Sequence, residues 1–381
     1  MIHLITGEYP PSRGGVADYT AVVAAGLAQA GVAVHVWCPG DGASAVTEGG
    51  VVVHRALGRM DRRDLRRAGE ALDAVAPPRR LIVQWVPHAF GQRALNIGFC
   101  RWARARARAG DRVEIVVHEP FLPFAMRPAH LAAAVVQRVM TAILLRAAAH
   151  VWVVTPAWEA RWRPYAFGRA VPFTWLPEPA SIPVTGDAAA ATAVRARAGP
   201  AGTVIVGSFS CGGGFARRVL ERVAPAVLER HPVSMLLLIG AGSTAVRDGL
   251  VERHCALAGR IHATGALDGP AVSAHLAACD VAVQPYPDGI CTRHSSAMTV
   301  LAHALPMVTT TGRFTEGVWH ESGAACLVDS HAVGGLSAEI DRLLSDEPAR
   351  RALAARAIDT YRKHFDLRHT VAALLSEHPC V

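Results

Sequence analysis

The residues whose types and spacing could do chemistry gather between Asp280 and Thr311. Asp288, Arg293 and His294 follow an apolar run that is typical of a buried strand. A carboxylate can accept hydrogen bonds from sugar hydroxyls, and a guanidinium can hold a phosphate through two parallel hydrogen bonds. The acid and the adjacent pair of cationic residues therefore indicate a site for a phosphorylated, hydroxyl-rich ligand.

The elements that must position these residues form one strand, helix, strand step. The pattern predicts a strand over Val281 to Gln284, a helix over Ser296 to Ala304 and a second strand from Met307. Loops at the carboxyl ends of parallel strands are where open α/β sheets bind ligands. Ser295 and Ser296 can cap the helix, whose first N–H groups would then face the same loop and favour an anion.

Two segments around this step, QPYPDGICT and AHALPMVTTTGRFTE, resemble the donor site of retaining glycosyltransferases of the GT-B type, family 4 in particular. In that family the first segment carries Glu-Gly-aromatic-Gly and the helix carries a second Glu. Asp288 best matches the first Glu, which implies that it contacts the transferred sugar as a catalytic group, and Thr299 stands in place of the second. The resemblance implies that the donor is bound by Gly289, Ile290, Cys291, Thr292, Arg293, His294 and Thr299.

The first predicted strand, Ile2 to Ile5, runs into a loop with two adjacent glycines, Gly14 and Gly15, before a helix that extends to about Gln29. Such glycines let the backbone approach a ligand closely and leave N–H groups pointing at it. The loop is similar to the Gly-Gly loop of family 4, which implies that both glycines lie near the donor phosphates and the acceptor. The resemblance also implies that Glu8 and Tyr9, in the same loop, contact the acceptor.

Histidines follow two further predicted strands. His118 comes directly after Val113 to Val117 and is followed by Glu119 and a proline that cannot continue a strand ladder. The resemblance implies that His118 contacts the donor sugar or the acceptor, with Glu119 orienting it or binding an acceptor hydroxyl. His88 follows the strand that ends at Trp85, where acceptor contact and a capped turn remain alternatives.

The usual phosphate-binding residues of family 4 are missing, because Ser208 and Gly213 occupy the positions of its Arg and Lys, and Lys363 is the only lysine of the chain. Either the protein does not bind a diphosphate, or arginines elsewhere neutralise it. The candidates are Arg293 and the pair Arg217 and Arg218, for which a solvated helix face is the structural alternative. Gly265 lies in a loop that, by the resemblance, receives the nucleotide base.

Composition places the chain among ordered globular proteins, with 381 residues and 51% hydrophobic residues. Its eight cysteines show no paired spacing, and no basic leader or membrane span is recognised, so we expect a cytoplasmic protein. The formal net charge of +8 is carried by the first 185 residues. It reflects either arginines on solvated helix faces or contact with an anionic acceptor or the inner membrane surface, whereas no nucleic-acid motif accompanies it.

The strand and helix pattern together with the resemblance predicts an α/β protein with two Rossmann-like, doubly wound domains, and the resemblance implies that they are of the GT-B type and face an interdomain cleft. We expect an acceptor-side domain over residues 1–180, a nucleotide-sugar domain over 181–360, and C-terminal helices over 361–381 that cross back to the first domain. The predicted reaction transfers a sugar, with retention, from a UDP or GDP sugar to a small-molecule, glycan or lipid-linked acceptor, without metal or cofactor. A sugar-nucleotide epimerase and a catalytically impaired binding protein of the same fold are the alternatives.

Overall fold

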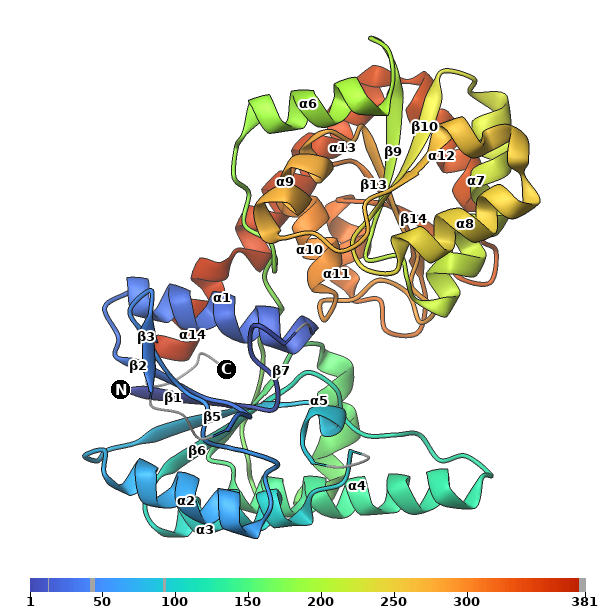
Figure 1. Cartoon of the computed structure of the whole chain (residues 1–381). Helices are drawn as coiled ribbons and strands as arrows, with labels where there is room; N and C mark the ends of the chain where they lie inside the picture. Colours follow the sequence, from blue (N-terminus) through green and yellow to red (C-terminus); the bar gives the residue numbers. More distant parts are fainter. Residues whose placement is uncertain (13, 42–44, 92–93, 377–381) are drawn as a thin grey trace. The chain divides into compact units, whose positions relative to one another are not determined.

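The computed structural model describes residues 1–12, 14–41, 45–91 and 94–376 (Figure 1). The chain divides into two compact units. Unit 1 comprises Met1–Glu178 together with the segment from Leu367, and unit 2 comprises Pro179–Asp366. The sequence placed the corresponding boundaries after residues 180 and 360, so the observed change of unit comes six residues later at the C-terminal side.

Unit 1 is built on an eight-stranded sheet in the order β3-β4-β2-β1-β5-β6-β7-β8. All neighbours pair in parallel except β3 and β4. The central strands are almost continuously apolar because helices cover both faces of the sheet, with α1 and α14 on one face and α2, α3 and α4 on the other (Figure 1). The strands are β1 Ile2–Thr6, β2 Val34–Trp37, β3 Val46–Glu48, β4 Val51–His54, β5 Arg80–Trp85, β6 Arg112–Val117, β7 His150–Val153 and β8 Phe173–Trp175. The α-helices are α1 Gly15–Gln29, α2 Arg62–Asp73, α3 Ile97–Arg108, α4 Pro128–Ala147, α5 Pro156–Trp162 and α14 Leu367–Leu375.

The last helix packs on the first within unit 1. A Cβ atom built on Gly26 of α1 would lie 2.9 Å from the Val371 side chain and 3.0 Å from that of Leu367. A larger residue at this position would push the two helices apart, because their backbones already approach closely. The C-terminal segment is therefore part of the core of unit 1.

Unit 2 is built on a six-stranded parallel sheet in the order β11-β10-β9-β12-β13-β14. The chain leaves β9 toward β10 and β11 and then returns to lay β12, β13 and β14 on the other side, so the order reverses between β9 and β12. The strands are β9 Val204–Phe209, β10 Ser234–Ile239, β11 Ile261–Ala263, β12 Val281–Gln284, β13 Met307–Thr311 and β14 Cys326–Asp329. The α-helices are α6 Ala188–Ala198, α7 Gly214–Arg230, α8 Ser243–Arg253, α9 Gly269–Ala277, α10 Ser295–Ala302, α11 Gly317–Ser322, α12 Gly335–Ser345 and α13 Glu347–Thr360. Two doubly wound α/β domains are thus confirmed.

Three elements of the structure were not predicted. Helix α6 lies in an Ala-rich segment, and its first turn is capped by the Asp187 side chain, which accepts from the Ala190 N–H at 2.9 Å. The short edge strands β3 and β8 were not predicted, because three-residue strands carry too little alternation to be recognised.

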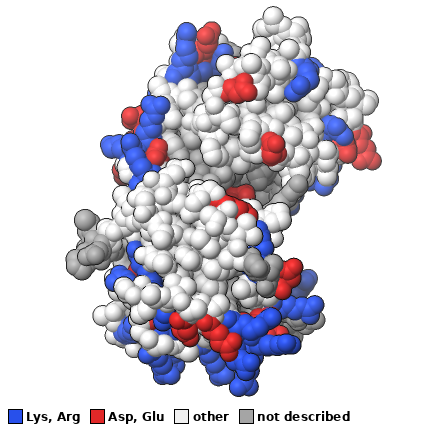
Figure 2. Space-filling model, turned by 60° about the vertical axis from the view of Figure 1, so that its left-hand side comes forward, with Lys and Arg blue, Asp and Glu red and all other residues white. Residues whose placement is uncertain are grey.

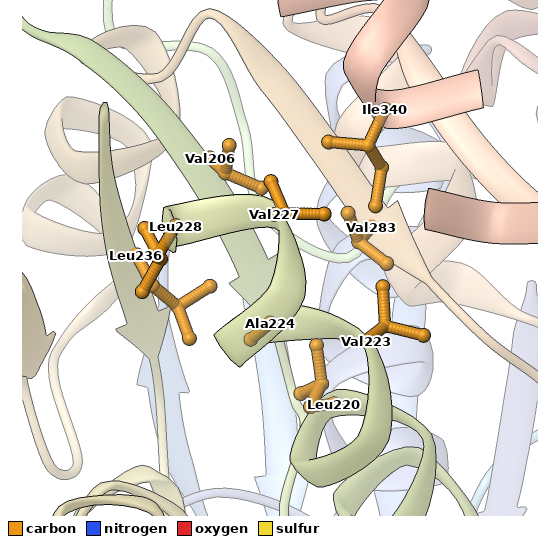
Figure 3. A pocket seen from close by; sticks show the side chains of 9 residues that line it. All are labelled: Val206, Leu220, Val223, Ala224, Val227, Leu228, Leu236, Val283 and Ile340. Carbon is orange, nitrogen blue, oxygen red and sulfur yellow. The ribbon is translucent and has the colours of Figure 1, made fainter. Parts of the chain in front are cut away.

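The core of unit 2 contains a cavity of about 20 Å³ between α7, the sheet and α12 (Figure 3). Its lining is entirely apolar and includes Val223, Val227 and Ile340, whose side chains point into it in Figure 3. A cavity of this size holds a water molecule only where polar partners are available, and none lines it. The cavity lies against the turn of α7 that contains Pro225. We interpret it as a packing void rather than a ligand site.

Candidate functional site

The loops that follow β9 and β12 leave the sheet of unit 2 side by side, at the point where the strand order reverses. Gln284, the last residue of β12, ties them together because its Oε1 atom accepts the Phe209 N–H at 3.0 Å and the Ser208 hydroxyl at 3.4 Å. Gln284 is 3% exposed and Ser208 1%. Ser208 therefore holds the start of the β9 loop, and the two loops border the crevice where doubly wound sheets bind ligands.

Helix α7 starts from this crevice without a side-chain cap. Gly213 is its N-cap residue, no side chain accepts its first N–H groups, and its first turn carries no acid. A Cβ atom on Gly212 would lie 3.1 Å from the Ala241 carbonyl oxygen, so this glycine allows the loop after β10 to pack closely. The 17-residue helix thus presents uncompensated backbone N–H groups and the positive end of its dipole at the loop.

Arg217 and Arg218, which the sequence could not separate, have different surroundings. Arg217 Nε donates to Glu221 Oε1 at 2.7 Å, and Arg253 approaches the same oxygen at 2.6 Å. Arg218 makes no ion pair with any residue that the structure describes, and its guanidinium lies 3.4 Å from a Cβ atom built on Gly214. Arg218 is therefore folded back beside the start of α7, whereas Arg217 belongs to a surface ion-pair cluster.

The loop after β12 is in direct backbone contact with the loop after β13. Gly289 has φ +83°, and a Cβ atom on it would lie 2.1 Å from the Gly312 nitrogen and 2.3 Å from Thr315 Oγ1. The Phe314 N–H donates to the Asp288 carbonyl oxygen at 3.1 Å across the same contact. Gly289 is therefore required both by its left-handed conformation and by the space available.

The Asp288 carboxylate, the predicted sugar-contacting acid, accepts from Arg313 Nε at 2.8 Å. Its side chain is 31% exposed, so it remains accessible from the loop surface. Arg313 was not singled out from the sequence. An arginine two residues after a strand end carries no signal that would assign it to an acid 25 positions earlier.

The next three residues of this loop, Ile290, Cys291 and Thr292, are completely buried. Their N–H groups donate respectively to the Thr310 carbonyl oxygen at 2.7 Å, to His294 Nδ1 at 3.1 Å and to the Glu316 carboxylate at 3.1 Å. The backbone N–H groups of these three residues are thus all hydrogen-bonded within unit 2. Burial also raises the pKa of the Cys291 thiol to about 12, so it is not a nucleophile near neutral pH.

His294 is not the cation that the sequence predicted. Its half-buried ring stacks on Tyr286 with ring centroids 3.8 Å apart and an interplanar angle of 9°. Burial, together with the neighbouring charge of Arg293, holds the pKa of His294 well below its usual value. Because Nδ1 accepts the Cys291 N–H, the ring is the neutral Nε2–H tautomer, and Arg293 is the remaining cation of the predicted pair.

The predicted serine cap of α10 is also wrong. The helix begins at Ser295, its N-cap residue is His294, and no side chain caps it. The Ser296 hydroxyl instead contacts the Tyr286 hydroxyl at 2.9 Å. Buried Thr299 accepts the Ser181 N–H at 3.2 Å and donates to the Ser295 carbonyl oxygen.

Gly265, predicted at the base-binding loop, follows β11 with φ +68°. Its N–H donates to the Ser243 hydroxyl at 3.0 Å, and it forms an isolated bridge with Gly240. The loops after β10 and β11 are therefore joined at the same edge of the sheet as the loop after β9.

In unit 1, the glycine loop is closed by an acid of the same loop. Glu8 Oε1 accepts the N–H groups of Val16 and Ala17 at 3.2 Å each, which caps α1. A Cβ atom on Gly14 would lie 2.3 Å from that oxygen, while one on Gly15 would meet nothing within 4 Å. The start of α1 thus already holds a carboxylate, and Gly14 is the residue that makes room for it.

Tyr9, the other predicted acceptor contact of this loop, is 7% exposed. Burial raises the pKa of its hydroxyl group. Its side chain thus belongs mostly to the interior of unit 1.

His118 lies in a buried polar cluster of unit 1. Its Nδ1 atom donates to Glu178 Oε1 at 2.7 Å, and Nε2 is 2.9 Å from Gln84 Oε1. The Tyr19 ring packs edge-on at 4.6 Å between centroids, and Trp158 Nε1 donates to the His118 carbonyl oxygen at 2.9 Å. Both ring nitrogens thus have hydrogen-bond partners. This geometry supports a role in which His118 positions the backbone of the loop that follows β6.

His88 and Glu119 lie on neighbouring loops after β5 and β6. The His88 Nδ1 atom is 3.8 Å from Glu119 Oε2, and both side chains are exposed. The structure thus brings these two predicted acceptor-side residues together. His118 precedes Glu119 in the chain but is buried, so their side chains have separate environments.

Several site residues were missed. Gln284 could have been noticed as a polar residue that ends an apolar strand, and Glu178 as an acid within a proline-rich segment. Glu316 carries no such signal, although it accepts from the backbone and hydroxyl of Thr292 and from Trp319 Nε1. Within the part of the chain that the structure describes, no three His, Cys, Asp or Glu residues are grouped to hold a metal ion.

Comparisons with known proteins bear on the family and the fold of the chain. Residues 203–346 match the family model described as glycosyl transferases group 1. No curated protein matches the chain in sequence. Sucrose-phosphate synthase from Thermosynechococcus elongatus has a similar structure, with a TM-score of 0.72 and 18% identity, covering 98% of this chain and 96% of that one.

Two further solved structures are similar over almost their whole length. The Anabaena protein HepE in complex with UDP and glucose gives a TM-score of 0.71 at 15% identity and covers 98% of both chains. WaaG, a glycosyltransferase involved in lipopolysaccharide biosynthesis, gives 0.64 at 13% identity, covering 99% of this chain and 100% of that one. The chain therefore has the two-domain GT-B fold of these glycosyltransferases, and the family match lies within unit 2, on the segment that carries the β9 and β12 loops.

Proposed function

We propose that the protein is a retaining glycosyltransferase that moves a sugar from a nucleoside diphosphate sugar to an acceptor hydroxyl. The observation that carries this proposal is the crevice of unit 2 between the β9 and β12 loops, inside the segment matched by glycosyl transferases group 1. There the uncapped start of α7 and Arg218 offer an anion site next to the loop that carries Asp288 and Arg293. A helix start with glycines and arginine suits a diphosphate, and a carboxylate suits sugar hydroxyls.

UDP is the donor nucleotide that we propose first. HepE was solved with UDP and glucose, and a related E. coli structure contains UDP-2-fluoro glucose. In this proposal the diphosphate contacts the first amides of α7, Arg218 and Arg293, and the base lies near Gly265. Asp288, already oriented by Arg313, faces the sugar.

The proposed reaction proceeds on one face of the sugar. The bond from the anomeric carbon to the diphosphate oxygen breaks, the acceptor oxygen bonds to the same face, and its proton passes to the leaving phosphate oxygen. This route needs no protein nucleophile, which fits a site whose acid is engaged by Arg313 and whose Cys291 is buried and protonated. Glu119 and His88 are the acceptor-side contacts, and His118 positions the loop that carries Glu119. We expect neither metal nor cofactor to take part.

Adjacent arginines provide a matched test of the donor site. We expect Arg218→Gln to weaken UDP binding at least tenfold, because a hydrogen bond to a charged group contributes about 1.5–3 kcal/mol, while uridine binding is unchanged. Arg217→Gln removes the same charge one residue away and should leave both affinities within about twofold, since its guanidinium is held by Glu221. Titration calorimetry with UDP and uridine measures these affinities. Equal losses for the two variants would contradict the assignment of Arg218.

Arg293 is tested in the same way. Arg293→Lys keeps the charge but loses the planar pair of donors, so UDP binding should weaken, and Arg293→Ala should weaken it further. Loss of uridine binding to the same extent would show that Arg293 supports the fold of the loop rather than the diphosphate.

A binding protein without transfer activity is the second candidate. It is favoured by Ser208 and Thr299, which occupy positions where the family carries charged residues but serve internal packing here. Incubation with UDP-glucose distinguishes a transferase from a binding protein. A transferase slowly hydrolyses the donor and releases UDP even without its acceptor, because water takes the place of the acceptor. Binding of UDP-glucose without release of UDP would favour the binding protein, and an epimerised sugar in the mixture would favour an epimerase.

A further inference from the structure

The outward side of helix α4 in unit 1 is apolar, which is the reverse of a surface helix in a soluble protein. Leu131, Val135 and Val139 follow one another at four-residue spacing and are 44%, 49% and 45% exposed. The neighbouring exposed positions of this side are Pro128, Ala132 and, at the end of the helix, Arg146. Until Arg146, therefore, no polar side chain lies on the exposed stripe.

The segment before α4 extends this apolar surface. Phe124 is 60% exposed and Met126 96%. Arg138 stacks over one face of Phe124, with its guanidinium carbon 3.7 Å from the ring centroid, and Phe124 nevertheless stays at the surface. Isolated exposed apolar residues are ordinary, but a run that continues from a loop along three turns of a helix indicates an interaction surface.

A basic pocket lies at the C-terminal end of the same helix. It has a volume of about 340 Å³ and is lined by Arg104 and Arg108 of α3, by Arg146 of α4 and by Arg169. Its one acid, Asp111, is already held by two other arginines, Arg79 at 2.7 Å and Arg106 at 2.6 Å. The pocket therefore has an uncompensated positive charge and donors suited to a phosphate.

Basic side chains gather on the same part of unit 1. Figure 2 shows them along the edge of unit 1 on which Figure 1 draws α2, α3 and α4. Exposed Phe167 continues the apolar surface beside the pocket, since the Arg146 guanidinium carbon lies 5.9 Å from its ring centroid. An apolar stripe with arginines at its end matches a lipid bilayer with anionic headgroups, which combines an acyl interior with surface phosphates.

Helix α4 is packed as a surface helix of unit 1 rather than as a membrane-spanning helix. Among the described helices, α4 is long and apolar enough to span a bilayer, with 20 residues and a mean hydropathy of 1.4. Its inner side, however, is buried in unit 1 through residues that include Gln137, Met140 and Thr141. A helix with one side packed on its own domain and an apolar opposite side lies in the interface plane.

We propose that the protein binds anionic phospholipid membranes peripherally through unit 1. The α4 surface, defined as Phe124, Met126, Leu131, Val135, Val139 and Phe167, inserts among the acyl chains. Arg104, Arg108, Arg146 and Arg169 bind headgroup phosphates. This inference does not depend on the proposed transfer reaction, because it concerns none of the residues assigned to that reaction and is tested by binding alone.

The test is sedimentation of the full-length protein with vesicles of phosphatidylcholine alone or of phosphatidylcholine mixed with phosphatidylglycerol. Binding is expected to the anionic vesicles only and to weaken in high salt, which screens the arginines. Val135→Asp should reduce the affinity about tenfold or more, since it removes buried apolar area and adds a like charge to the lipid surface. The matched control is Val233→Asp, because Val233 is a valine of unit 2 that is 70% exposed.

Replacing both Arg108 and Arg146 with Gln should weaken binding by about fivefold per arginine, since each contributes about 1 kcal/mol at an anionic surface. Arg247→Gln and Arg351→Gln together, on exposed helices of unit 2, are the charge-matched control and should change it little. The proposal is overturned if anionic vesicles are not bound, or if Val135→Asp and Val233→Asp have the same effect. It is also overturned if the lipid-free protein is a dimer that Val135→Asp converts to a monomer, because the α4 surface would then join two copies.

Discussion

Replacing Gly289 by Ala should separate the two loops that shape the candidate donor site. A Cβ atom there would lie 2.1 Å from the Gly312 nitrogen, so the backbone of the β13 loop would have to move. Two costs add up. Holding a non-glycine residue in the left-handed conformation costs about 1–2 kcal/mol, and forcing extra volume into a packed site costs about 1–3 kcal/mol.

The matched control is Gly202→Ala, in the turn before β9. Gly202 has φ +89°, similar to the +83° of Gly289, but a Cβ atom on it would meet nothing within 4 Å. Gly202→Ala should therefore cost only the conformational part, about 1–2 kcal/mol, against about 2–5 kcal/mol in total for Gly289→Ala. The difference between the two variants isolates the close approach of the loops.

The measurements are urea unfolding of the full chain and hydrogen exchange at two amides. The Ile290 and Phe314 N–H groups donate across the contact, to the carbonyl oxygens of Thr310 and Asp288. Both should exchange faster in Gly289→Ala than in Gly202→Ala. UDP binding should weaken in the first variant only. Equal stability of the two variants, with unchanged exchange at both amides, would refute the described packing of these loops.

Two further predictions concern unit 1. The pKa values of His3 and His54 are lowered to about 4, first by burial and then by neighbouring histidines. The unfolded chain then takes up these protons first, so unit 1 should be fully stable above pH 6.5 and lose roughly 3 kcal/mol for His3 as pH falls toward 4. Urea unfolding across this range checks the effect, which His54→Gln should reduce, and a flat stability profile would contradict it. His118→Ala should reduce transfer by at least about 100-fold, because a shift of the loop that it positions misplaces the reacting groups, but it should also cost about 3 kcal/mol of stability because Glu178 is left buried without its partner. Kinetics together with thermal unfolding checks this, and full stability with unchanged activity would exclude both roles.

Much of the fold could be predicted from the sequence, because it depends on patterns within single segments. The apolar run of Val281 to Gln284 and the restart of a strand at Met307 predicted a parallel step, and β12 pairs with β13 in that way. The same local patterns show where each strand ends. They therefore place the loops at the strand ends, the glycines before helices and the histidine after β6 at one edge of each sheet. The transferase roles of His118, Asp288 and Arg293 stay predictions.

Only the tertiary structure decided what each polar residue contacts. His118 is held by Glu178, 60 positions away, and Thr299 by Ser181, 118 positions away. The local sequence does not indicate either partner, because the two residues of each pair come into contact only when their unit folds. Charge depends on the surroundings in the same way. The sequence predicts a cation at His294, yet desolvation inside unit 2 and the adjacent charge of Arg293 lower its pKa and keep it neutral. A sequence specifies which groups can form hydrogen bonds or carry charge, whereas desolvation and the partner at contact distance, which exist only after folding, determine which of them do.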